Sequence, residues 1–126
     1  MGIFIGIATC DPGNWTFNGL PARSVRHLNV IGGVLSSIGW AGSVNAVATN
    51  LTRRLESFPI GSLLPELARD INEALAANGS NVQVSASTLG VLSLYALVDW
   101  LHTQGVIAYN RPPEEIAKQQ LAAPSP

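Results

Sequence analysis

The hydrophobic residues in the first half of the chain repeat with the period of an α-helix and cover an unusually wide face. They fall on two neighbouring stripes: Leu28, Ile31, Leu35 and Ile38 on the first, and Val30, Val34, Ala41 and Val44 on the second. Two such stripes are wider than the face a surface helix buries. The stretch from Leu28 to Thr52 also contains no charged residue. The pattern therefore predicts a helix from about Ser24 that is covered on much of its circumference.

Small residues are interspersed in this stretch at three- and four-residue spacings. They are Gly32, Gly33, Ser36, Ser37, Gly39, Gly42 and Ser43. Small side chains let helix backbones approach one another closely, whereas each Gly costs about 1 kcal/mol of helix propensity relative to Ala. The sequence thus predicts a break near Gly39 to Gly42, after which the helical pattern resumes from Val44 to Leu55.

Two further helices are predicted in the second half of the chain. From Leu63 to Ala77 the apolar residues form a narrow stripe opposite charged residues. Ser62 is a favourable N-cap for this helix, and Asn78-Gly79 supplies its end. A longer helix begins at Ser85, or two residues later, and runs to about Gln104. Its apolar residues lie all round it, which is typical of a central helix.

Short alternating segments at 81–85 and 106–109 predict minor β structure, and Gly2 to Thr9 suits a short strand or an anchoring arm. We therefore predict a mainly α fold, a compact helical domain of about four helices with a short extended N-terminal arm and minor β structure near 82–85 and 106–109. The whole chain, 1–126, is expected to be a single domain. Its expected parts are an arm and loop over 1–22, a helical core over 23–110, and a short polar helix with a flexible tail over 111–126.

Charged residues make up only 12% of the chain, which is about half the usual share. A soluble monomer of this size needs polar groups on its surface, so we expect a partner or lipid to cover part of the apolar area. The net charge is −1 and no basic cluster is present, which disfavours nucleic acid as a partner. No secretory signal is recognisable in the short apolar N-terminus, and the sequence leaves the localisation open.

Residues typical of catalytic or metal sites are sparse. Cys10 is the only cysteine, which excludes an internal disulfide and a multi-thiolate metal site. No phosphate-binding loop and no recognisable metal-ligand spacing is present, so we expect no cofactor and no metal. Asp99 and His102 are three residues apart on a helix, close enough for the carboxylate to orient the imidazole. A cation at a helix C-terminus is the favoured interpretation of His102, and an enzyme is not expected; a small-molecule-binding enzyme using Asp99 and His102 is the second alternative.

The order of a helix, a turn, a long helix and the segment Gly105 to Tyr109 resembles that of a winged-helix domain. The resemblance is limited to this order. The helix that would read DNA has no Lys or Arg between Asn72 and His102, so contacts to bases and phosphates have no source. We therefore do not expect the chain to bind DNA in this way.

Two uncharged stretches, Leu28 to Thr52 and Ala74 to Val98, have the length of membrane spans. The first contains several Asn, Ser and Thr side chains, and each amide is costly in hydrocarbon unless it finds a partner. The second is interrupted by polar residues from Asn78 to Asn81. Coverage by protein is the favoured interpretation, and a small membrane-inserted subunit or pore component using residues 28–51 is the first alternative.

We therefore expect a non-enzymatic structural subunit that self-associates or packs into a larger multi-protein particle, such as a virion. Its partners would be copies of itself or other subunits of the assembly. Aromatic residues often anchor interfaces, and small residues let a neighbouring helix approach closely. The predicted interface residues are Trp15, Phe17, Gly32, Ser36, Gly39, Trp40, Ser43, Tyr95 and Trp100.

Overall fold

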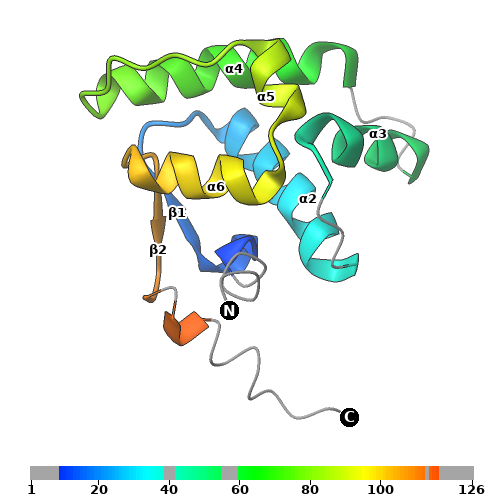
Figure 1. Cartoon of the computed structure of the whole chain (residues 1–126), viewed down its shortest axis with the longest axis horizontal. Helices are drawn as coiled ribbons and strands as arrows, with labels where there is room; N and C mark the ends of the chain where they lie inside the picture. The colour runs from blue at the N-terminus through cyan, green and yellow to red at the C-terminus, as the bar shows by residue number, and fades with distance from the viewer. Residues whose placement is uncertain (1–8, 39–41, 55–59, 113, 117–126) are drawn as a thin grey trace.

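The computed structural model describes residues 9–38, 42–54, 60–112 and 114–116, and it confirms the mainly helical prediction. The elements in chain order are η1 (Pro12–Asn14), β1 (Trp15–Phe17), α2 (Ala22–Ile38), α3 (Val44–Arg54), α4 (Ile60–Ala77), α5 (Ala86–Val91), α6 (Leu94–Thr103) and β2 (Ile107–Tyr109). Figure 1 shows α4 above α6, with α2 crossing behind and the two strands side by side at one end. Residues 2–8 of the predicted arm, and residues 113 and 117–126 of the predicted polar helix and tail over 111–126, lie outside the described residues, while 114–116 are helical.

The predicted break in the first helical stretch is confirmed, because α2 ends at Ile38 and α3 begins at Val44. Ser43 begins the new helix in the way expected of an N-cap. Its side-chain oxygen accepts a hydrogen bond from the amide of Ala46 at 3.1 Å, which satisfies one of the donors left free at a helix start.

Helix α4 begins at Ile60, two residues before the predicted N-cap Ser62, so that boundary was wrong. The helix continues through Pro65, although proline gives up one backbone hydrogen bond. Its end matches the prediction. Gly79 adopts a positive φ of 82°, and the amide of Ser80 donates to the carbonyl of Leu75 at 2.9 Å, which is a Schellman ending.

The single long helix predicted from Ser85 to Gln104 is wrong, because the structure divides it into α5 and α6 at Leu92 and Ser93. Ser85 does cap α5, and its oxygen accepts from the amide of Thr88 at 3.1 Å. At the division, the carbonyl of Leu92 accepts a hydrogen bond from the amide of Val44 at 2.8 Å. This long-range hydrogen bond and the N-cap at Ser93 stabilise two separate helices, whereas the apolar pattern alone had predicted one continuous helix.

Strands β1 and β2 form a two-stranded antiparallel sheet in which Trp15 faces Tyr109 and Phe17 faces Ile107. The predicted strand near 106–109 is thereby confirmed. The predicted strand near 82–85 is wrong, because residues 81–85 pair with no other strand in the described part of the chain. Instead, these residues run back along α4 towards α5 (Figure 1). The side chain of Asn72 on α4, rather than a neighbouring strand, accepts a hydrogen bond from their backbone.

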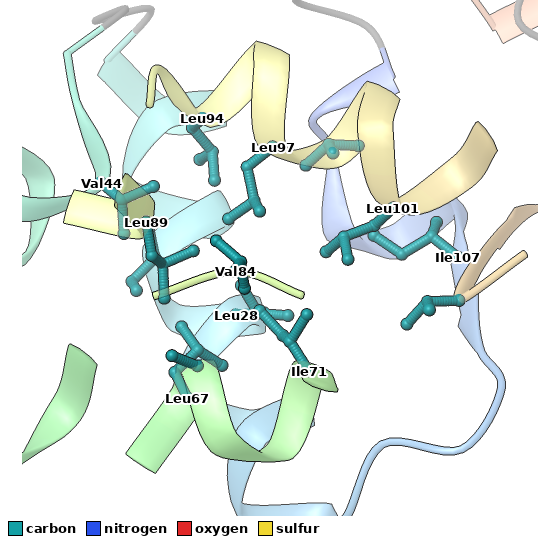
Figure 2. Packing of buried hydrophobic residues seen from close by; sticks show 14 of the residues in the cluster. Leu28, Val44, Leu67, Ile71, Val84, Leu89, Leu94, Leu97, Leu101 and Ile107 are labelled. Atoms are coloured by element: carbon teal, nitrogen blue, oxygen red, sulfur yellow. The ribbon is translucent and has the colours of Figure 1, made fainter. Parts of the chain in front are cut away.

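The hydrophobic core lies between α6 and the pair α2 and α4. Figure 2 shows Leu94, Leu97 and Leu101 projecting from α6 towards the side chains of Leu28 and Ile71. All five are fully buried, and each buried leucine contributes roughly 1.5–3 kcal/mol. Of the two predicted stripes, Leu28, Ile31 and Val44 are fully buried within the chain, whereas Val30 and Val34 are partly exposed. Among the described helices, none is both long enough and apolar enough to cross a membrane.

Candidate functional site

Three of the predicted interface residues contact one another inside the chain. Trp15 is only 7% exposed, and its indole N–H donates to the carbonyl of Thr9. Its ring lies directly on Gly32, where an added Cβ would come within 2.6 Å of the indole. Phe17 meets the Trp15 ring edge to face, with centroids 5.8 Å apart. Gly32 is thus needed for close approach within the fold, because any larger side chain would displace Trp15.

The other predicted interface residues have different surroundings. Ser43 caps α3, as described above. Tyr95 and Trp100 are half-buried on α6 and pack against the core from its edge. The side chain of Ser36, together with Gly39 and Trp40, falls outside the described part of the structure. Among the described members of this set, Trp100 alone lines an apolar groove, which is considered below.

The side chains of Asp99 and His102 do not contact each other as a carboxylate–imidazole pair would. Both side chains are exposed, and within the described residues no hydrogen bond or ion pair joins them. The His102 ring instead stacks on Tyr109, with centroids 4.2 Å apart and an interplanar angle of 22°. The pair therefore lacks the orienting contact that a carboxylate–imidazole couple requires.

Cys10 is fully buried among core residues. Burial, reinforced by the negative charge of Asp99, raises the pKa of the thiol to about 12. The thiol therefore stays protonated at neutral pH and is a poor nucleophile. In the described ranges, no three His, Cys, Asp or Glu residues come together in a way that could hold a metal ion.

A buried ionic junction between α2 and α4 was missed by the sequence analysis. Asp70 is fully buried, and its two carboxylate oxygens accept hydrogen bonds from the guanidinium of Arg23 at 2.9 and 2.8 Å. The hydroxyl of Ser24, also buried, donates to the same carboxylate at 2.6 Å. These hydrogen bonds outweigh burial and lower the pKa of Asp70 from its ordinary 3.8 to about 2. The buried carboxylate and the buried Ser24 hydroxyl are therefore both satisfied within the chain, and we interpret this junction as a structural contact between the two helices.

The best candidate for a binding surface is a groove between α6 and the segment that follows α4. It encloses about 420 Å³. Its walls are Val82, Gln83, Val84, Thr88, Leu92, Ala96 and Trp100, and none of these residues is charged. Val82 at its rim is 47% exposed, and Val91, at the neighbouring end of α5, is 76% exposed. Two other recesses differ, because one of about 610 Å³ contains Arg69 and Glu73 and one of about 460 Å³ contains Arg111.

One wall of the groove is held by a single amide side chain. Asn72 on α4 donates from Nδ2 to the carbonyl of Val84 at 2.9 Å and accepts the amide of Val84 at Oδ1, at 2.8 Å. This two-bond pattern copies the exchange between paired residues of an antiparallel ladder. The amide of Val82 donates to the hydroxyl of Ser80 at 3.2 Å. In the described part of the chain, the backbone of Gln83 makes no hydrogen bond, so the opposite edge of the segment is open.

The alternation of this segment had predicted minor β structure, whereas the side chain of Asn72 bonds to its backbone instead. Comparison with protein-family models, with curated proteins and with solved structures found no match.

Proposed function

We propose that the protein is a non-enzymatic assembly subunit, such as a structural subunit of a virion or other multi-protein particle. It self-associates through the groove beside α6. The observation that carries the proposal is the groove itself. Uncharged residues line it, and two exposed valines, Val82 and Val91, stand at or near its rim. Contiguous exposed apolar surface is typical of interaction sites.

The charge distribution supports a second copy as the partner. Charged side chains among the described residues lie elsewhere, including the Arg23–Asp70 junction and Arg53–Arg54 at the end of α3. A groove that carried a net charge would repel the same groove on a second copy, whereas an uncharged groove does not. A two-fold contact requires such self-complementarity.

The test is the mass of the purified chain in solution, measured by light scattering after size exclusion across a range of concentrations. We expect a discrete oligomer, and we expect Ala96→Glu to weaken association at least tenfold because it places an unpaired charge in the groove. Ala76→Glu on α4 is the matched control, since Ala76 is also exposed but lies outside the groove.

Three results would contradict the proposal. The unaltered chain could remain a monomer at every concentration. Ala96→Glu could leave the oligomer unchanged, or Ala76→Glu could disrupt it to the same extent.

A further inference from the structure

We infer that residues 81–85 of two copies pair with each other as antiparallel strands, around a two-fold axis that passes through Gln83. The contact is strand addition, in which an unpaired strand edge of one molecule bonds to the main chain of another. The inference rests on the proposed function, because it gives the self-association proposed there a definite contact and register.

Main-chain hydrogen bonds alternate along this segment. The amide of Val82 donates to the hydroxyl of Ser80, and the amide and carbonyl of Val84 both bond to the side chain of Asn72. By contrast, the amide and carbonyl of Gln83 form no hydrogen bond within the described residues. Neighbouring residues of a strand direct their main-chain groups to opposite sides. The pattern is therefore that of a strand bonded along one edge and open along the other.

The open edge extends two positions to each side of Gln83. The amide and carbonyl of Asn81 and the amide of Ser85 form no hydrogen bond in the part of the chain that the structure describes. All three residues are exposed. The backbone of Ser85 is extended, with φ −94° and ψ 161°, and its carbonyl accepts a hydrogen bond from the amide of Leu89 in α5. Figure 1 shows the segment running along α4 between the end of that helix and the start of α5.

This open edge is complementary to itself. In an antiparallel pair, two residues directly opposite exchange both main-chain bonds, and residues two positions away are again a bonded pair. With Gln83 opposite Gln83 of the second copy, each open amide meets the other copy's open carbonyl. Asn81 then lies opposite Ser85 of the second copy, where the open amide of Ser85 meets the open carbonyl of Asn81. A two-fold contact requires such self-complementarity.

The same register brings valine side chains together at the groove. Val82 of one copy lies opposite Val84 of the other, in a pair without mutual hydrogen bonds, where side chains approach more closely. Val84 is 6% exposed and lines the groove, whereas Val82 at the rim is 47% exposed. Pairing therefore places Val82 of the second copy beside Val84 in the groove and covers its exposed side chain.

The sequence around this edge contains nothing that opposes pairing with a second copy. Proteins usually protect an exposed strand edge with charged side chains, proline or a bulge. Residues 74–98 contain no charged residue and no proline. The edge facing α4 is already bonded to Asn72, so only one edge of each segment is open. The contact therefore closes at two copies, which makes a dimer the unit of association.

The first test places a cysteine at the two-fold axis. In Gln83→Cys, the two introduced thiols lie opposite each other, with Cα atoms about 5.5 Å apart, a separation that a disulfide spans. Asn81→Cys is the matched control, because Asn81 is also exposed but its two copies lie four positions out of register, roughly 13 Å apart along the strands. Under oxidised glutathione, we expect disulfide dimers to form at least tenfold faster in Gln83→Cys, measured by non-reducing electrophoresis. The unaltered chain, whose Cys10 is buried, gives the background.

The second test places charges at the same point. Gln83→Lys and Gln83→Glu each put two like charges directly opposite each other, which destabilises a cross-strand pair. We expect each variant alone to dimerise about three- to fivefold more weakly than the unaltered chain. An equal mixture of the two should recover the dimer, measured by light scattering. Asn81→Lys mixed with Asn81→Glu is the control and should show no such recovery, because each of these side chains faces Ser85.

The outcomes separate this inference from the proposed function. Equal cross-linking of Gln83→Cys and Asn81→Cys, or a Lys–Glu mixture at position 83 that dimerises no better than its components, would overturn the inference. If either occurs while the unaltered chain is a discrete oligomer that Ala96→Glu disrupts, the inference fails and the proposed function stands. If the unaltered chain stays a monomer at every concentration, the proposed function fails and the inference fails with it.

Discussion

Helix α4 contributes polar side chains to two regions. In one the polar groups are hydrogen-bonded within the chain, and in the other part of the backbone stays open. At the junction with α2, the carboxylate of Asp70 is buried and is satisfied by Arg23 and Ser24. One side of the groove wall is satisfied by Asn72, but the far side of that wall is open and apolar. The first region is complete within the chain, whereas the second offers both main-chain groups and apolar space to a partner. The comparison suggests that stability and association depend on two separate regions, both of which are anchored to α4.

The largest expected effect comes from breaking the junction. Asp70→Ala leaves the buried Ser24 hydroxyl without its acceptor, while the half-exposed Arg23 guanidinium keeps Glu66 at 3.4 Å, and we expect a loss of roughly 2–3 kcal/mol in the free energy of unfolding. Chemical denaturation measures it. Glu73→Ala, one turn further along α4 and exposed, is the control and should change stability by less than about 0.5 kcal/mol. Equal losses in the two variants would show that the buried carboxylate has no special part in stability.

Acid should weaken the same junction by a smaller amount. The pKa of Asp70 is lowered from 3.8 to about 2 in the folded protein. Its contribution is therefore complete above pH 3.8 and is lost as the pH falls towards 2, by roughly 2 kcal/mol. Unfolding free energies measured between pH 6 and pH 2 should fall more steeply for the unaltered chain than for Asp70→Ala. Parallel curves for the two proteins would contradict this assignment.

The smallest expected effect on stability comes from the groove wall. Asn72→Ala removes the partner of the Val84 amide and carbonyl, and because both bonds are only partly buried, water can replace it at a cost of roughly 0.5–1.5 kcal/mol. Because residues 82–84 then lose their anchor, we also expect self-association to weaken at least tenfold. Asn81→Ala is the matched control, since Asn81 is exposed, does not line the groove, and its side chain forms no hydrogen bond within the described residues. Unchanged association in Asn72→Ala would separate the wall from the binding surface.

Local sequence signals predicted the helices well where a cap or a stop was encoded. Asn78-Gly79 ended α4 as expected, and Ser85 caps α5 as predicted, whereas Ser43, predicted as an interface residue, caps α3. The division of the last long helix was missed, although Ser93 was a visible cap. Its decisive contact, from Val44 to Leu92, joins residues far apart in the sequence.

The candidate site could be predicted only in part. Alternation at residues 81–85 predicted a strand that the structure does not form, and it could not show that Asn72 would take the place of a strand partner. Asp70 looked like an ordinary surface charge on an amphipathic helix, because its partner Arg23 lies 47 positions earlier. Side chains that satisfy one another over such distances leave no periodic trace in a single sequence.

The pairing of β1 with β2 has a consequence for how the chain is made. Tyr109 follows its partner Trp15 by 94 positions, so nearly the whole domain is synthesised between them. At roughly 5–20 residues per second, translation leaves β1 without its strand partner for about 5–20 seconds. During that interval the amide of Asn18 lacks the carbonyl of Val106, to which it is bound in the finished protein. A ribosome-bound chaperone that recognises extended aromatic segments would have that time to act on Trp15 to Phe17, before the end of the chain arrives to complete the sheet.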